Sequence, residues 1–455
     1  MDYSKCSMIN AIIDANAPIG PFEWWRHSVG QGGINLRPIS PAACAAMAKI
    51  KPRLIRIFVQ QHFDIYPRHD VFDWSRLDPY MDALASTGAK VLASITIKPG
   101  PLYPVVDQKI WRPNDVAEWQ KVVAHLVKRY SVDKKIVTHW GIGNETNIGE
   151  NGGCPYLITE PKDFNEYYAM TARPIMETFP QAKIGGPSAA GGRVPQIAGL
   201  VDYCGETGLP LDFISWNHYH NDPATHVDLV KFNSGIRRRT ENPPELIVTE
   251  WNKWPSAWNN PPVSVEEQAF APNRAVVAAS ILFSFLRSGV DWTFYYHLQD
   301  GAVYPKEFAS FYADVPMMVK HWNEYPHRFG LFGANGEVRP QYFVYQMLSR
   351  MGCELLHLSG PEAELPLLAA RDDQAISAMI INDGRSADRI VNCELRHLDR
   401  GPKTLTVYRI DEQRRWNSGT CELLPVERRN IDFPGDTFRM QIWAPRESVS
   451  MVHVE

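Results

Sequence analysis

Short apolar runs alternate with longer, helix-like segments along the chain as far as about residue 350. This rhythm is typical of β-α-β units, in which helices join parallel strands. Eight strands, each followed by a helix, favour a closed (β/α)8 TIM barrel over an open doubly wound sheet. We therefore predict an α/β fold with a barrel domain over residues 1–352. The predicted barrel strands are residues 11–15, 54–59, 90–97, 137–145, 183–188, 211–219, 245–252 and 290–298.

The pattern changes after residue 352, where apolar segments follow one another without helix-like segments between them. Such a succession of strands is typical of a β-sandwich. We therefore predict a small C-terminal β-sandwich domain over residues 353–455. A stretch rich in Pro and Asn at residues 258–267 is predicted to be an insertion over the mouth of the barrel.

The net charge and the cysteine content limit the kinds of binding partner and the cellular compartment that the sequence predicts. The formal net charge is -4 and no basic block is present, so neither nucleic acid nor an anionic membrane is indicated as a partner. The seven cysteines are scattered and include no Cys-x-x-Cys pair, which favours reduced thiols over a disulfide framework or a zinc knuckle. The N-terminus lacks a signal-peptide pattern, and no segment reaches the length of a membrane span. These features predict a cytoplasmic protein.

Two glutamates end two of the predicted strands. Glu145 closes the fourth strand directly after Asn144, and Glu250 lies near the end of the seventh. In TIM barrels the C-terminal ends of the strands carry the chemistry, so the two side chains should converge at the mouth. Either glutamate alone could belong to a buried structural ion pair. Both together favour a functional pair, because an unpaired carboxyl group is costly to bury.

Paired carboxyl groups suit the cleavage of a glycosidic bond. One must be protonated to give a proton to the leaving oxygen, and the other must be ionised to attack the anomeric carbon. In a retaining enzyme the two groups lie about 5–5.5 Å apart. The sequence therefore favours a glycoside or an oligosaccharide as the binding partner, and we expect neither a cofactor nor a metal.

Asn144-Glu145 after one strand, with Glu250 three strands later, resembles clan A of the glycoside hydrolases. Within that clan the chain is similar to glycoside hydrolase family 39, the family of β-xylosidases and α-iduronidases. Three further stretches carry this resemblance, and it covers most of residues 10–352. They are WWRHSVGQGG at 24–33, WTF at 292–294 and GLFGANGEVRPQYFVYQMLSRMG at 330–352. The C-terminal β-sandwich also fits the family.

The resemblance implies a role for individual residues. Glu145 would be the acid/base and Glu250 the nucleophile of a retaining double displacement with a covalent glycosyl-enzyme. Asn144 would bind the sugar 2-hydroxyl, and Arg56 would help to keep the nucleophile ionised. Tyr219 would donate a hydrogen bond to the nucleophile. We further expect a set of residues around the mouth to bind substrate, namely Asn217, His218, Trp251, His62, His297 and Asp300.

The chain also departs from the family pattern. Thr146 stands where the clan usually has Pro, and Gln299 and Asp300 follow the WTF strand where β-xylosidases of the family tend to carry sugar-binding acidic residues. These differences leave the sugar open without changing the predicted mechanism. The family's sixth-strand His could correspond to His218 or to His220. Trp24, Trp25, Trp254 and Trp258, like Trp251, lie in or beside loops predicted to cover the mouth, where one or more could form a platform for a sugar ring.

Four interpretations remain open from the sequence. The first is a β-xylosidase-like exo-acting glycosidase, which we favour because bulky loops could close one end of the cleft. The second is an α-L-arabinofuranosidase of the same clan, whose motifs also include Asn-Glu and Glu-Trp-Asn. The third is a non-catalytic carbohydrate-binding barrel, and the fourth is a metal-dependent hydrolase that uses His218 and His220. The sequence leaves the oligomeric state open, a homo-oligomer included.

Overall fold

A computed structural model describes residues 7–32, 35–254, 272–324, 328, 330–360, 365–384 and 387–455. The predicted insertion at 258–267, with Trp258, lies outside these residues. Contacts divide the chain into two compact units. One unit comprises Met1–Trp24, Ser264–Arg287 and Glu337–Glu455, and the other comprises Trp25–Val263 and Ser288–Gly336.

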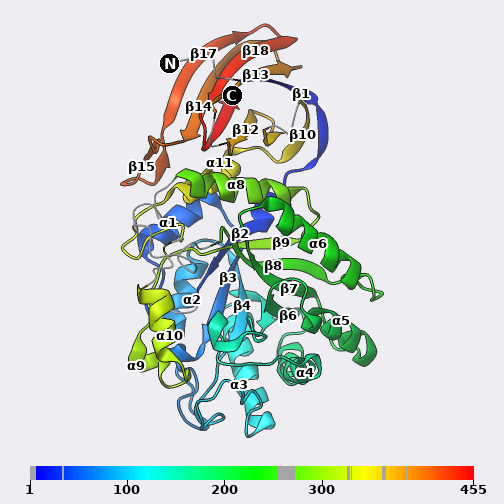
Figure 1. Cartoon of the computed structure of the whole chain (residues 1–455), viewed down its shortest axis with the longest axis vertical. Coiled ribbons are helices and arrows are strands. Elements are labelled where there is room, and N and C mark those ends of the chain that lie inside the picture. Colours follow the sequence, from blue (N-terminus) through cyan, green and yellow to red (C-terminus); the bar gives the residue numbers. More distant parts are fainter. Residues whose placement is uncertain are drawn as a thin grey trace. The chain divides into compact units, whose positions relative to one another are not determined.

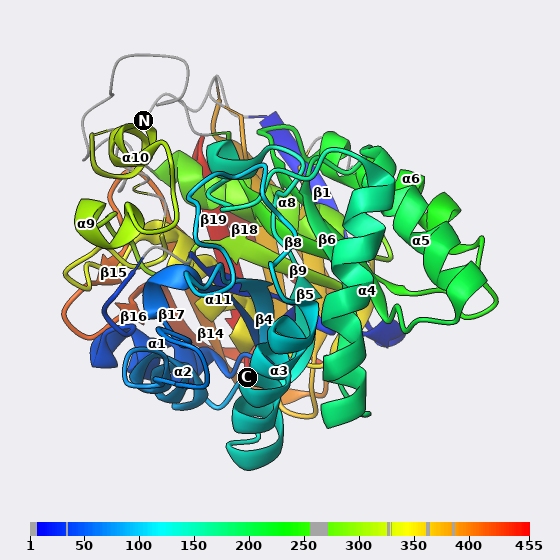
Figure 2. The same ribbon diagram turned by 90° about the horizontal axis from the view of Figure 1, so that it is seen from below.

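The second unit contains a closed barrel of eight parallel strands, which confirms the predicted fold class. Pairing of the last strand with the first closes the ring, because His27 to Gly30 lie in register with Thr293 to Tyr296. Figures 1 and 2 show helices outside this ring of strands. The barrel strands are β2 (His27–Gln31), β3 (Leu54–Gln60), β4 (Lys90–Thr96), β5 (Val137–Ile142), β6 (Lys183–Ala190), β7 (Phe213–Tyr219), β8 (Glu245–Asn252) and β9 (Trp292–Tyr296).

Some of the helices between these strands begin at a side-chain cap. Ser40 caps α1, because its hydroxyl accepts a hydrogen bond from the Ala43 amide while Pro41 takes the first helical position. Asp115 and Asp222 cap α3 and α6 in the same way. The outer helices of this unit are α1 (Pro41–Ile50), α2 (Leu77–Ala85), α3 (Val116–Val127), α4 (Pro161–Thr178), α5 (Pro195–Thr207) and α6 (Pro223–Arg237).

A long segment after β9 adds further helices to the same unit. It contains α9 (Pro305–Phe308), α10 (Val315–Val319) and a π-helical turn at Lys320–Glu324. Its own small core includes Phe308, Tyr312 and Met318.

The prediction that residues 11–15 form the first barrel strand is wrong. These residues lie in β1 (Ser7–Pro21), which pairs with β13 (Arg389–Arg396) and β10 (Glu354–Ser359) in the sheet of the other unit. The first barrel strand is β2, which lies outside the predicted strand. Burial alternates along β1 from Ile9 to Ala15, as expected for a strand with one solvated face. Barrel strands such as β3 are buried on both faces.

The other unit is built on one nine-stranded sheet, with the order β17-β14-β19-β12-β11-β10-β1-β13-β18. Strands from opposite ends of this order share one core, in which Val391 and Ile442 join Leu405 and Phe433. The sheet therefore folds over on itself into a sandwich, as predicted. Its remaining strands are β11 (Leu367–Arg371), β12 (Ile376–Asn382), β14 (Gly401–Ile410), β17 (Pro425–Phe433), β18 (Thr437–Ala444) and β19 (Ser448–Val454).

Two helices, α8 (Pro272–Leu286) and α11 (Pro340–Arg350), pack against each other in this unit. A short hairpin of β15 (Trp416–Asn417) and β16 (Glu422–Leu423) completes it. The division into domains at residue 352 stays a prediction.

Candidate active site

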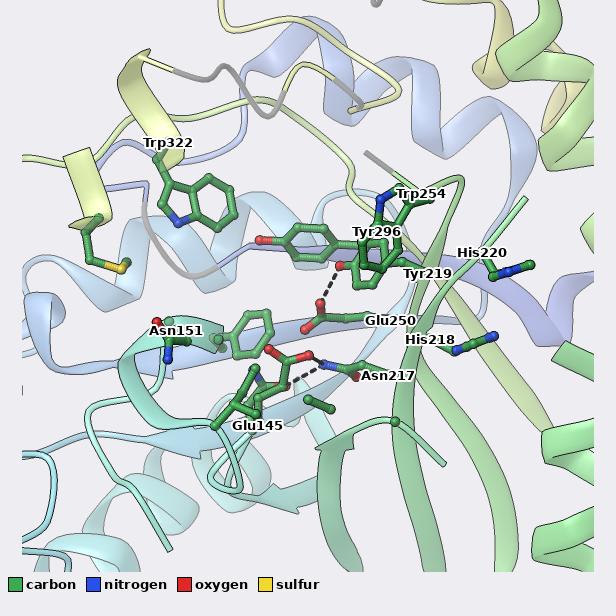
Figure 3. Close-up of a pocket in the computed structure, with 18 of the residues that line it drawn as sticks. Glu145, Asn151, Asn217, His218, Tyr219, His220, Glu250, Trp254, Tyr296 and Trp322 are labelled. Carbon is green, nitrogen blue, oxygen red and sulfur yellow. Dashed lines mark hydrogen bonds between the residues drawn. The ribbon is translucent and has the colours of Figure 1, made fainter. Parts of the chain in front are cut away.

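A cavity of about 480 Å³ lies where the barrel strands end. Its lining comes from strands β3, β6, β7, β8 and β9, from the loops after β5, β6, β7 and β8, and from the segment after β9. Figure 3 shows Glu145 and Glu250 pointing toward one another inside it. This is the convergence that strand-end positions predict in a TIM barrel.

Glu145 is held by the backbone of the loop that follows β5. It has a positive φ of 47°, its amide donates to the Ser188 carbonyl at 2.9 Å, and its own carbonyl accepts from Ile148 and Gly149. The residue is 9% exposed, and its Oε1 accepts a hydrogen bond of 2.9 Å from Asn217 Nδ2. Burial first, and then the charge of Glu250, raise the pKa of Glu145 from 4.5 to about 8. Its carboxyl group is therefore protonated at neutral pH.

Glu250 lies in a different environment, although it is only 5% exposed. Arg56 Nη1 donates to its Oε1 at 2.8 Å, and the Tyr219 hydroxyl donates to its Oε2 at 2.6 Å. Arg56 is fully buried, with its guanidinium group 4.1 Å from the centre of the Phe58 ring. Both donors stabilise negative charge on this carboxyl group. One cavity thus holds a carboxyl group whose pKa is raised and another that accepts hydrogen bonds from a buried guanidinium group and a phenol hydroxyl.

A network of hydrogen bonds connects the two carboxyl groups. Asn217 Nδ2 donates to Glu145 Oε1 and lies 3.2 Å from Asn144 Oδ1. Arg56 Nη2 donates to the same Asn144 oxygen at 2.7 Å and so extends the network to Glu250. Residues from β3, β7, β8 and the loop after β5 are therefore fixed relative to one another, as preorganised chemistry requires.

The structure brings only part of the predicted substrate-binding set to the cavity. Asn144, Asn217, His218 and Tyr219 line it, as do His220 and Trp254. The His218 Nε2 atom lies 3.1 Å from the Thr225 hydroxyl, and burial lowers the pKa of His218 to about 4, so its ring is neutral at pH 7.

The other predicted residues lie away from the cavity lining. Trp251 is fully buried, with its ring centre 5.2 Å from that of Tyr295. The ring of His62 stacks on Phe308. His297 Nε2 lies 2.9 Å from Asp300 Oδ1, in a pair that is almost completely buried. None of these side chains is among the described residues that line the cavity.

Several lining residues were missed by the sequence analysis. Phe58 and Tyr296 come from β3 and β9, Ile148 comes from the loop after β5, and Met318 and Trp322 come from the helical segment after β9. Phe58 could have been found, because it lies two residues after Arg56 on one strand and therefore faces the same side. Trp322 carries no comparable signal, since it follows β9 by more than twenty residues.

The described part of the chain shows neither a metal site nor a membrane-spanning helix. No group of three or more His, Cys, Asp or Glu residues there, His218 and His220 included, could hold a metal ion. No helix among the same residues is both long and apolar enough to cross a bilayer.

Comparison with models of known families shows to which family the chain that carries this site belongs. The family model described as "Glycosyl hydrolases family 39" matches residues 53–420. The chain belongs to glycosyl hydrolases family 39. The match includes Glu145 and Glu250 and confirms the family that the sequence motifs indicated.

Curated relatives of this family 39 chain include two bacterial enzymes. A β-xylosidase from Geobacillus stearothermophilus is 24% identical over 301 residues, which span 62% of this chain and 53% of that enzyme. A β-xylosidase from Caldicellulosiruptor saccharolyticus is 21% identical over 337 residues, which span 68% and 64% of the two chains. The matched part of this chain therefore spans between half and two thirds of each relative.

A solved structure also confirms the fold. The crystal structure of a monomeric β-xylosidase from Caulobacter crescentus superposes with a TM-score of 0.75 at 18% identity, covering 99% of both chains.

Proposed function

We propose that this family 39 chain is a retaining, exo-acting glycosidase of the β-xylosidase type. The observation that carries the proposal is the difference between the two carboxyl groups of one cavity. Burial and like charge keep Glu145 protonated, whereas Arg56 and Tyr219 stabilise the charge of Glu250. This is the division of roles that an acid/base and a nucleophile require.

In the first proposed step, the Glu250 carboxylate attacks the anomeric carbon of the bound glycoside. The bond from that carbon to the leaving oxygen breaks, and Glu145 gives its proton to this oxygen. A glycosyl ester on Glu250 results, and the leaving group departs as an alcohol. In the second step, ionised Glu145 takes a proton from water while the water oxygen attacks the anomeric carbon. The ester bond breaks, the sugar leaves with its original configuration, and both glutamates return to their starting states.

The surrounding side chains suit supporting roles. Asn144 and Arg56 are joined through the Asn144 Oδ1 atom, so we assign the Asn144 amide nitrogen to the sugar 2-hydroxyl. Asn217 keeps Glu145 oriented, and His218 is placed to meet a sugar hydroxyl. His297 and Asp300 lie behind this lining, and we propose that their pair supports Tyr296, whose ring centre is 4.7 Å from that of His297. Trp251 and His62 are assigned to packing.

The relatives suggest a xyloside as the first substrate to test, because both curated relatives are β-xylosidases. Exo action is supported by the bulky side chains of Met318 and Trp322, which form one wall of the cavity. A wall of this kind leaves room for a terminal sugar more readily than for an uninterrupted chain. The described cysteines form no disulfide with one another, which supports our proposal of a reducing, cytoplasmic location.

A panel of p-nitrophenyl glycosides tests the proposed function. We expect release of nitrophenol from the β-xyloside in preference to the α-arabinoside, β-galactoside, β-glucoside and β-glucuronide. Proton NMR should show that the first product formed has the same anomeric configuration as the substrate. The Glu250→Gln protein, tested for folding by circular dichroism, is the matched control and should be inactive on every member. Inversion at the anomeric carbon, or cleavage that survives Glu250→Gln, would contradict the proposal.

A further inference from the structure

One wall of the cavity comes from the segment that follows β9. Met318 in α10 and Trp322 in the next helical turn both line the cavity, and the Trp322 ring centre lies 6.2 Å from that of Tyr296. Figure 3 shows Trp322 on the far side of Tyr296 from His218 and His220. The position of this segment therefore decides how much room a substrate has.

Glu150 connects this segment to the loop that carries Glu145. It lies five residues after Glu145, in the turn Gly149–Gly152, and is only 2% exposed. Its Oε1 accepts the Ala313 amide at 2.8 Å, and its Oε2 accepts the Asp314 amide at 2.9 Å. Both carboxylate oxygens thus hold the backbone immediately before α10.

The connection is reinforced around Gly153. The Tyr312 hydroxyl donates to the Gly153 carbonyl, which also accepts Gln60 Nε2 at 2.9 Å. On its other side, Glu150 donates its own amide to Gln108 Oε1 at 2.9 Å. The turn is therefore fixed to the barrel, and the segment with Trp322 is fixed to the turn.

A buried carboxylate is an expensive way to fill space, because its charge must leave water. An apolar side chain would pack the same interface at lower cost. A carboxylate that accepts two consecutive backbone amides sets the distance and the angle between two segments, which packing alone does less well. Because Glu150 lies next to the loop of the acid/base, a precise distance and angle between the two segments matter at this position.

We propose that Glu150 is a positioning residue that shapes the substrate cavity by holding the Met318–Trp322 wall against the loop of Glu145. This inference rests on the proposed function, because the wall matters only if a glycoside binds there. Glu150 itself does not line the cavity, so it acts through the wall rather than by touching the substrate.

Replacement of Glu150 by Gln keeps the shape and removes one acceptor, so an NH2 group then faces a backbone amide. The wall should loosen, and KM for a nitrophenyl glycoside should rise about three- to tenfold. The value of kcat should change less than about twofold, because Glu145 keeps its own backbone contacts to Ser188 and Ile148. The matched control is Glu307→Gln, which makes the same substitution at a half-buried site in α9 of this segment.

A double-mutant cycle with Trp322→Ala distinguishes this role from a general effect on stability. If Glu150 acts through Trp322, the double variant should have the same KM as Trp322→Ala alone. Effects on KM that multiply independently, a loss confined to kcat, or an unchanged KM would each overturn the proposal. Tyr312→Phe removes the neighbouring hydrogen bond and should act in the same direction, which keeps the test decisive if Glu150→Gln fails to fold.

Hydrogen exchange separates this inference from the proposed function. In the free protein, Glu150→Gln should speed amide exchange in the peptide that contains Ala313 and Asp314. This measurement does not depend on activity. If the wild-type protein cleaves no glycoside but exchange is faster in Glu150→Gln, the proposed function is contradicted and the contact is confirmed. Unchanged exchange in Glu150→Gln would contradict the contact itself.

Discussion

Arg56 Nη1 donates a 2.8 Å hydrogen bond to Glu250 Oε1, and the second terminal nitrogen of the same guanidinium group donates to Asn144 Oδ1. One buried cation therefore fixes the proposed nucleophile and the residue that precedes the proposed acid. The two sides of the site cannot shift independently without breaking one of these bonds.

The first prediction concerns this cation. Arg56→Lys keeps the charge but cannot make both bonds in the same geometry, so kcat/KM should fall about 100- to 1000-fold. Arg56→Met leaves Glu250 buried without its partner and should lower the free energy of unfolding by about 3–5 kcal/mol. Steady-state kinetics and urea denaturation measure the two effects. Wild-type kinetics in Arg56→Lys would show that the paired geometry is unimportant.

The second prediction concerns pH. Because the pKa of Glu145 is raised to about 8, the acid form is lost as pH rises through 8, and kcat/KM should decline above it. This group's contribution to stability is fully present below pH 4.5 and is lost as pH rises toward 8, since the folded state binds the proton more tightly than the unfolded state.

Glu145→Gln should remove both pH dependences. Rates on a phenyl glycoside, whose poor leaving group needs the acid, and unfolding free energies, each measured from pH 5 to 9, provide the test. A basic limb that persists in Glu145→Gln would assign the titration to another group.

The third prediction concerns Gly152. A Cβ atom there would lie 2.7 Å from Glu145 Cβ and closer still to Oε2, so Gly152→Ala must displace the carboxyl group. We expect a loss of about 10- to 100-fold on glycosides with poor leaving groups and a smaller loss on dinitrophenyl glycosides, which need no acid. Glu145→Ala should show the same selectivity in stronger form.

The matched control is Gly100→Ala, because a Cβ at that position meets nothing within 4 Å. Equal losses on the two kinds of substrate would show that Gly152→Ala damages more than the acid.

The fourth prediction contrasts two tryptophans. Trp254 lines the cavity and is 39% exposed, so Trp254→Ala should raise KM about three- to tenfold with little change in stability. Trp251 is fully buried, so Trp251→Phe should lower the free energy of unfolding by about 1–3 kcal/mol and leave KM unchanged. Thermal unfolding and kinetics on one aryl glycoside are sufficient. A higher KM in Trp251→Phe, with a loss of stability in Trp254→Ala, would mean that Trp251 binds substrate and Trp254 packs in the core.

Much of the central site could be predicted from the sequence because it lies on strands. Strand ends are fixed by the apolar runs before them, and side chains two residues apart face the same side of a strand. Arg56, Asn217, Tyr219 and Glu250 were identified in this way or through family motifs, and all four belong to one hydrogen-bonded network with Glu145 that passes through Asn144.

The same rule explains one prediction that did not match the structure. Trp251 directly follows Glu250 on β8, so its side chain faces the opposite side of the strand and packs against Tyr295. Residues 11–15 were misassigned for a different reason. Their alternating burial matches a half-solvated strand, but the partners β10 and β13 lie more than 340 residues away, and no local pattern identifies them.

The wall formed by Met318 and Trp322 depends on tertiary contacts that local sequence does not encode. Its position is set by the bonds of Glu150 to the Ala313 and Asp314 amides, which join segments more than 160 residues apart. Neither periodicity nor a motif marks a carboxylate that binds backbone amides.

The most direct test of the central claim is to trap the covalent intermediate. A 2-fluoro glycoside of the preferred sugar, with a good leaving group, should slow both steps and allow the glycosyl-enzyme to accumulate. Digestion and mass spectrometry should then place one label on the peptide containing IVTEWNK, at Glu250. A label on Glu145 or any other carboxyl group, or unlabelled protein that still turns over the parent sugar, would contradict the assignment of Glu250 as the nucleophile.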